Sequence, residues 1–383
     1  MKWIIPIVFL FLNLPNTLFS NEVDAFISGG HLYVYGDSND NRVSIFSTGP
    51  GQIRVVGASN SAGQPTIVNG QSNGSIALNG WSGGVYAYMY SGNDDVTIHD
   101  VTVAGVAHFD LGNGNDGMHV GQTMSAMDSI LRSGLTPISY TGEAEMNSAL
   151  RVLGIGGNDF VEINGVSVVG RTTVNLGSGI DSLTIGQESA EPTASSLTEF
   201  GAPLSIIAGA DRDDVNIFGI DAYDNVNVDD GNGRLNLIMT DVWVNNSLSV
   251  NGSTVADLVE LTGVFVRNEL DVDGFDGNDI INVYSSQATN LLIDAGVGSD
   301  RVTIDDFFGD LLRTDLGTGS DNLSVSAGDF LTILGYGSTA NDRFSYDTTL
   351  ANEVFVSGGV GTDTLVQAGN SFGSLETDSI END

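Results

Sequence analysis

Aspartate residues recur at one constant interval in the C-terminal third of the chain. The series is Asp279, Asp300, Asp321, Asp342 and Asp363, and several of its members end a glycine-rich stretch such as GVGSD or GTGSD. Carboxylate oxygens are hard ligands for Ca²⁺, and an aspartate in a turn can also accept hydrogen bonds from nearby backbone N–H groups. The spacing therefore predicts one carboxylate at the same place in every copy of a repeat.

A second acid precedes several of these positions by six residues, so that two carboxylates flank one glycine turn. Such pairs are the candidate ligands for a divalent cation. The full set of candidate metal ligands is Asp110, Asp116, Asp273, Asp279, Asp294, Asp300, Asp315, Asp321 and Asp363.

The same template recurs upstream with looser spacing, for example in GNDDVTI, LGNGNDGMHV and LGSGIDSLTI. Each copy has a short strand, a glycine turn and a second strand with alternating apolar residues. A unit of about 21 residues cannot bury its own apolar face, but stacked units can. The sequence therefore predicts an all-β fold, a single-stranded right-handed parallel β-helix (β-solenoid). A propeller built from doublets of the unit is disfavoured because consecutive copies do not alternate in character.

Stacked coils would bring equivalent aspartates about 4.8 Å apart, where like charges repel. Three arrangements relieve that repulsion. Ca²⁺ can lie between the coils, the carboxylates can face water, or each can accept a hydrogen bond from its own turn. Asn41 and Gly74 fill the aspartate position in divergent copies, which turn chemistry permits more readily than metal ligation. The residues alone leave all three possibilities open.

The turns resemble the calcium-binding nonapeptide repeat of RTX, or haemolysin-type, proteins, with the pattern G-G-x-G-x-D-x-U-x. The best match is Gly358, Gly359, Gly361 and Asp363, and AGVGSDRVTI matches in part. The resemblance implies Ca²⁺ between stacked coils. It covers only the turn of each unit, and the motif occurs once per unit rather than in tandem copies. Only one edge of the solenoid would carry such turns.

The N-terminal stretch MKWIIPIVFLFLNLPNTLFS has one cation followed by a short apolar run, which is typical of a secretory signal peptide. We therefore expect a signal peptide at 1–20, an N-terminal cap at 21–40, the β-helix at 41–365 and a C-terminal cap with an acidic tail at 366–383. The expected location is secreted, either extracellular or on the cell surface. The stretch at 123–134 is the best candidate for a short helix.

Charge narrows the class of partner. The chain has 49 acids against 12 bases, a net charge of −37, and no cysteine. Such a surface repels nucleic acids and anionic lipids and attracts divalent cations. We expect no nucleic-acid partner and no membrane span, because no segment after the signal peptide is long and apolar enough. Extracellular polysaccharide and other surface proteins are the macromolecular partners that remain.

Two other motifs suggest chemistry and have simpler explanations. GNGNDG at 112–117 fits a dinucleotide fingerprint, but it continues into a strand rather than a helix and so predicts a repeat turn. His99, His108 and His119 lie close together in the sequence and could converge on zinc, yet they lack a recognised ligand spacing. Ordinary strand histidines are the preferred interpretation.

Aromatic and acidic clusters offer two further candidates. Tyr86, Tyr88 and Tyr90 share one face of a strand; a buried stacking row is preferred over an exposed surface for sugars or proteins. In DDFFGD at 305–310, acids surround two phenylalanines, an arrangement that a pectinase-like hydrolase could use.

Taken together, these patterns predict a secreted or cell-surface, adhesin-like structural β-solenoid that is stabilised by Ca²⁺ and has no catalytic activity. The alternatives are a carbohydrate-active β-helix enzyme of the pectinase-like hydrolase class and a carbohydrate-binding module. A concave groove lined by acids and aromatics in units 81–110 or 305–310 would favour the enzyme.

Overall fold

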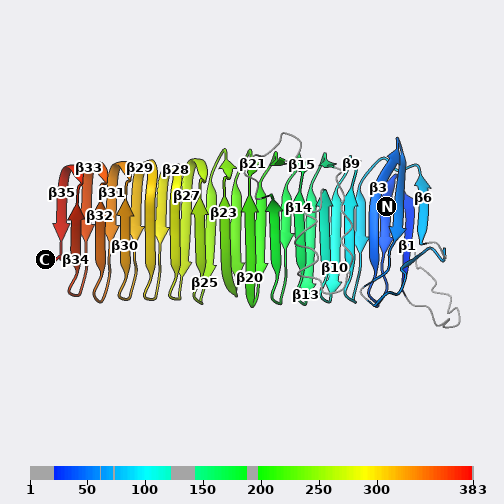
Figure 1. Cartoon of the computed structure of the whole chain (residues 1–383), viewed down its shortest axis with the longest axis horizontal. Helices are drawn as coiled ribbons and strands as arrows, with labels where there is room; N and C mark the ends of the chain where they lie inside the picture. Colours follow the sequence, from blue (N-terminus) through cyan, green and yellow to red (C-terminus); the bar gives the residue numbers. More distant parts are fainter. Residues whose placement is uncertain (1–20, 61, 72–73, 122–142, 188–196, 382–383) are drawn as a thin grey trace, which may run out of the picture.

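A computed structural model describes residues 21–60, 62–71, 74–121, 143–187 and 197–381. The signal peptide expected at 1–20 and the helix expected at 123–134 lie outside the described residues. The chain forms a β-solenoid of about 12 coils, stacked parallel about 22 residues apart, and the described residues contain no helix. The coils stack into one straight rod, with the two ends of the chain at opposite ends (Figure 1). The predicted all-β solenoid is confirmed.

Each coil contributes strands to three walls. The first wall precedes the glycine turn and contains β2 (His31–Tyr35), β7 (Val85–Tyr88), β10 (Ala107–Asn113), β13 (Leu150–Gly156), β16 (Thr172–Asn175), β19 (Leu204–Gly209), β22 (Val226–Gly231) and β25 (Leu248–Ser253). The second wall follows the turn and contains β3 (Arg42–Gly49), β8 (Asp95–His99), β11 (Gly117–Gly121), β14 (Phe160–Asn164), β17 (Ser182–Gly186), β20 (Arg212–Phe218), β23 (Arg234–Thr240), β26 (Leu258–Thr262), β30 (Asn322–Ser326), β32 (Arg343–Asp347) and β34 (Thr364–Ala368). The third wall contains β9 (Val101–Val103), β12 (Ala144–Met146), β15 (Val166–Val168), β18 (Thr198–Phe200), β21 (Ile220–Ala222) and β24 (Trp243–Val244).

Toward the C-terminus the strands run on through the corners between walls. These long strands are β27 (Phe265–Phe275), β28 (Ile280–Asp294), β29 (Arg301–Asp315), β31 (Asp329–Tyr336), β33 (Leu350–Ser357) and β35 (Ser371–Asp378). The offset between equivalent residues changes here as well. It is 22 residues from Asp257 to Asp279 but 21 from Asp279 to Asp300 and onward.

The core fills the inside of the rod because every wall alternates inward apolar residues with outward polar ones. In one coil, Val226 and Val228 of the first wall and Leu237 and Met239 of the second are all 1% exposed or less. The same alternation in successive coils makes one continuous apolar interior. No single unit has such a core alone, which is why the repeat requires stacking.

The N-terminal end has antiparallel strands. β1 (Glu22–Ser28) pairs antiparallel with β2, and β3, β4 (Gln52–Gly57) and β6 (Ser75–Asn79) form an antiparallel sheet. The short β5 (Ile67–Val68) pairs with the start of β1. Beyond it, the Asn69 amide accepts the N–H of Ala25 at 2.6 Å and donates to its carbonyl at 2.7 Å. Asn69 thus occupies backbone groups that would otherwise leave a sheet edge open.

Candidate functional site

The repeated aspartates form a ladder of hydrogen bonds between coils, called here the aspartate ladder. Oδ1 of each one accepts the backbone N–H of the equivalent residue one coil earlier. Asp300, for example, accepts the N–H of Asp279 at 2.7 Å and donates its own N–H to Asp321 Oδ1 at 2.7 Å. The accepting side chains are Asp94, Asp116, Asp159, Asp181, Asp213, Asp257, Asp279, Asp300, Asp321, Asp342 and Asp363.

The ladder has identifiable ends and one break. It begins at Asn41, whose N–H donates to Asp94, and ends where Glu381 Oε2 accepts the N–H of Asp363 at 2.8 Å. The acidic tail therefore supplies the last carboxylate. The break is at Leu235, which occupies the aspartate position and donates its N–H to Asp257 but has no carboxyl group of its own.

Burial makes these carboxyl groups hard to ionise. The ladder aspartates are 3% exposed or less. Loss of hydration raises the pKa of Asp94 to about 9 and that of Asp279 and Asp321 to about 7, although the hydrogen bond to Oδ1 opposes the shift. Asp159, Asp181 and Asp213 also have a pKa raised to about 7 by burial.

An outer ladder runs beside the aspartates in the opposite sense. The residue before the aspartate is often asparagine, and its Oδ1 accepts an N–H from the following coil. Asn93 accepts from Asn115 at 2.8 Å, and Asn115 accepts from Asn158 at 2.7 Å. Asn278 and Asn341 act in the same way farther along. The Asn-Asp pair thus bonds to both neighbouring coils.

The glycine two residues before most ladder aspartates is required by close stacking. A Cβ at Gly114, Gly157, Gly179, Gly298 or Gly319 would lie between 1.3 and 1.9 Å from the carbonyl oxygen of the equivalent glycine one coil earlier. No side chain fits at these five positions, whereas Asp211, Val255 and Ala340 take the equivalent position in other coils. The glycine in these coils is therefore set by contact between coils, and the interpretation of GNGNDG as a repeat turn is confirmed.

The second set of predicted metal ligands lies on the outer face of the first wall. Asp273, Asp294 and Asp315 are aligned in register on adjacent strands. Asp273 Oδ1 accepts the N–H of Phe275 at 3.0 Å, and Asp315 Oδ1 accepts that of Gly317 at 3.2 Å, which are Asx-turn contacts two residues on. Burial, followed by the neighbouring Asp315 and Asp273, raises the pKa of Asp294.

These outer acids do not join the ladder aspartates in one ligand group. Asp110 sits in β10 between Tyr88 and Leu153 on the adjacent strands, without a stacked acid. Among the described residues, no three Asp, Glu or His side chains gather where they could hold a metal ion.

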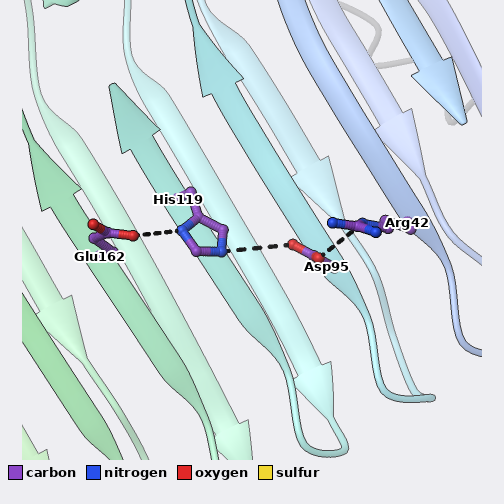
Figure 2. A network of polar contacts seen from close by, with 4 residues as sticks. All are labelled: Arg42, Asp95, His119 and Glu162. Carbon is purple, nitrogen blue, oxygen red and sulfur yellow. Dashed lines mark hydrogen bonds and ion pairs between the residues drawn. The ribbon is translucent and has the colours of Figure 1, made fainter. Parts of the chain in front are cut away.

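Four ionisable side chains form a row across the second wall, called here the charge row: Arg42, Asp95, His119 and Glu162. No sequence pattern predicts that these four residues meet. Arg42 Nε lies 3.1 Å from Asp95 Oδ2, and Asp95 Oδ1 lies 4.0 Å from Nε2 of His119 (Figure 2). Nδ1 of His119 lies 2.8 Å from Glu162 Oε2. The four side chains come from β3, β8, β11 and β14, and all but Arg42 are buried. The Arg42–Asp95 ion pair and the His119–Glu162 contact offset the cost of burying these polar side chains.

His99 lies in a separate contact beside this row. Ser44 Oγ is 3.1 Å from His99 Nε2, and His99 Nδ1 is 2.8 Å from Asp100 Oδ2. The order matches a Ser-His-Asp triad, but Ser44 and His99 are buried whereas the Asp100 side chain is 57% exposed. A nucleophile at the buried end cannot reach a substrate. The third histidine, His108, contacts the rings of Tyr86 and Tyr88, so the three do not converge.

Asp100 opens onto a groove of about 790 Å³ between the β3–β4 hairpin and the third wall. Glu143, Glu145 and Trp81 also line it. Thr102 Oγ1 donates to Glu145 Oε2 at 3.0 Å. Part of its lining, including Trp81 and Asp100, belongs to the unit 81–110, where the sequence analysis placed a possible enzyme site, and the rest comes from outside that unit. The DDFFGD stretch is different: it lies inside β29, with Phe307 buried and Phe308 exposed.

The tyrosine row points outward, so the interpretation as a buried row is wrong. Val85 and Ala87 take the inward positions, which leaves Tyr86 and Tyr88 on the outer face. Tyr33 stacks on Tyr86 with ring centroids 5.3 Å apart, and Tyr35 stacks on Tyr88 at 5.5 Å. Rings stacked along the rod cover one another's faces. They present edges and hydroxyl groups to solvent rather than the open faces that bind sugars.

Comparison with known proteins finds no family model, no curated protein and no solved structure that matches the chain. The assignment as a β-solenoid therefore rests on the coil geometry itself. Within the described ranges, no helix has the length and apolar character needed to cross a membrane.

Proposed function

We propose that the protein is a secreted or cell-surface structural β-solenoid, adhesin-like and without catalytic activity. The observation that supports this proposal most directly is that the repeated residues make contacts between neighbouring coils. Aspartate, asparagine and glycine at the turn all serve contacts between coils. Such repetition suits a rigid spacer, which presents its outer faces to extracellular polysaccharide or surface proteins.

Fractionation of cells that express the full chain tests the location. The protein should appear in the medium or at the surface, and a variant lacking residues 1–20 should stay in the cytoplasm. Equal cytoplasmic retention of both forms would contradict the proposed location.

A carbohydrate-active enzyme is the second candidate, and the groove at Asp100, Glu143 and Glu145 favours it. Two carboxylates beside a bound sugar could act as acid and base. The purified protein should be incubated with neutral and acidic polysaccharides while reducing ends are measured. The scaffold proposal predicts no release. Release that disappears in Asp100→Asn and persists in Asp306→Asn would replace it with the enzyme.

Calcium stabilisation, which the RTX resemblance implies, stays a prediction. Melting of the full chain by circular dichroism in CaCl₂ and in EDTA, with MgCl₂ at equal ionic strength, tests it. A ligand that binds only the native state raises the melting midpoint. Equal midpoints in all three solutions would remove Ca²⁺ from the proposal.

A further inference from the structure

One oxygen of most ladder aspartates has no hydrogen-bond partner among the described residues. While Oδ1 bonds to the preceding coil, Oδ2 is fully buried. The orphan Oδ2 atoms belong to Asp94, Asp159, Asp181, Asp213, Asp279, Asp300, Asp321, Asp342 and Asp363. An ionised carboxylate left in this way would carry an uncompensated buried charge.

The groups that face Oδ2 are themselves acceptors. At Gly274, the position that a Cβ would take lies 2.8 Å from Asp279 Oδ2 and 2.7 Å from the carbonyl oxygen of Ala295 in the next coil. An orphan carboxyl oxygen and a carbonyl oxygen flank the same point at Gly154, Gly337 and Gly358. Two acceptors on one side of a glycine repel each other unless a proton or cation lies between them.

Calcium fits this arrangement poorly. Ca²⁺ takes about six to eight oxygen ligands from carboxylates, backbone carbonyls and water. Each coil offers one free carboxyl oxygen and the carbonyl oxygen beside it, because Oδ1 is bonded to an N–H and the outer acids form separate Asx turns. No group of three acidic or histidine ligands gathers within the described residues. The donor set therefore disagrees with the RTX resemblance.

We propose that the orphan aspartates of the ladder from Asp94 to Asp342 are un-ionised carboxylic acids in the folded protein, with the Oδ2 proton directed at a carbonyl oxygen of the next coil. A single proton satisfies both acceptors and removes the charge. The ladder thereby binds protons from solvent in place of a metal, which goes beyond the scaffold role proposed above.

The charged surroundings of Asp279 favour the proton. The titratable groups that face it are Asp257 and Asp300 in the adjacent coils and Asp276 in its own turn, all of them acids. Burial is the largest cause of its raised pKa of about 7, followed among the raising causes by these three carboxyls. Asp257 is a natural contrast in geometry, because its Oδ2 accepts the N–H of Ser253 at 3.0 Å.

Paired substitutions in the full chain test the proposal. In Asp279→Asn, the amide oxygen can accept the ladder N–H while the NH₂ group faces the carbonyl of Ala295. We expect its melting midpoint at pH 8 to exceed that of the wild type by roughly 5 °C, and the two to agree at pH 4. In Asp257→Asn, the amide must point a donor at the N–H of Leu235 or Ser253. That control should melt below the wild type at both pH values.

Infrared spectroscopy of the wild type gives a readout that does not depend on any variant folding. An un-ionised carboxylic acid has a carbonyl stretch that a carboxylate lacks, and we expect this band at pH 6 in folded protein only. Absence of the band, or an Asp279→Asn protein no more stable than the wild type at pH 8, would overturn the proposal. So would a midpoint raised by CaCl₂ at pH 8 in the wild type but not in Asp279→Asn, because the ladder would then bind calcium.

Discussion

Replacing Gly319 by alanine should disrupt the stack more than any comparable surface change. A Cβ there would lie 1.3 Å from the carbonyl oxygen of Gly298, where contacts below 3.0 Å essentially never occur. The two coils must therefore separate locally by at least 1.7 Å, the difference between these two distances. Gly319 also has a φ of +140°, a region that side-chain-bearing residues rarely adopt.

The cost can be worked from the bonds that such a separation breaks. The N–H of Gly298 donates to the carbonyl of Thr318 at 2.8 Å, and the N–H of Thr318 donates to the carbonyl of Gly296 at 2.8 Å. Losing these two bonds costs about 1 kcal/mol each, and the strained backbone adds about 1–3 kcal/mol. With the displaced contact of Asp321, the loss in the free energy of unfolding should be about 4–6 kcal/mol.

Gly80→Ala is the matched control. Gly80 has a φ of +85°, and nothing lies within 4 Å of its Cβ position. Only the left-handed backbone is penalised there, at about 1–2 kcal/mol. Urea unfolding followed by circular dichroism measures both variants, and hydrogen exchange locates the opening at the coils around Gly319. If the two variants lose equal stability, the stacking explanation for the repeated glycine is wrong.

Three further predictions concern the ladder, the charge row and the core. Stability should fall as pH rises from about 4 to about 9, because the folded pKa values are raised above the unfolded 3.8. Protonation thus stabilises fully below pH 3.8 and is lost through the folded values of about 6 to 9, as urea midpoints across pH would show. His119→Leu removes the 2.8 Å contact with the buried carboxyl group of Glu162 and should cost about 1–3 kcal/mol in urea unfolding; an unchanged midpoint would contradict this. Phe344→Ala empties a fully buried site and should cost about 3–5 kcal/mol, with a loss below about 1 kcal/mol indicating local collapse.

The fold could be predicted because the same residue types recur in the sequence at the interval of one coil. Four equal intervals separate the ladder aspartates from Asp279 to Asp363, and alternating apolar residues follow each one, a pattern that requires stacked strands. The role of the aspartate could not be settled in the same way. A spacing shows that carboxylates stack, but it does not show which oxygen meets which N–H. The ladder bond goes to the preceding coil rather than to the residue's own turn, and the carboxyl group is buried rather than facing water.

The charge row was beyond sequence reasoning for a different reason. Arg42, Asp95, His119 and Glu162 are separated by unequal intervals, because insertions interrupt the period in this half of the chain. Only the strand register brings them onto one face. The tyrosines were misjudged because alternation identifies two faces but does not say which is inward. The small inward partners Val85 and Ala87 carry that information.

The break at Leu235 shows that each ladder bond contributes to stability separately from the others. In a solenoid each coil contacts only its neighbours, so the ladder bonds contribute locally and can be lost one at a time. At the break, Leu235 packs its side chain in the core and still donates its N–H to Asp257. A buried carboxyl group remains in the same coil, since Asp230 is 0% exposed and its pKa is raised by burial. The coil thus keeps the stacking bond on one side and a buried acid nearby. The position tolerates an apolar residue because each hydrogen bond between coils forms independently of the others, which agrees with the ladder of backbone N–H groups and carboxyl oxygens.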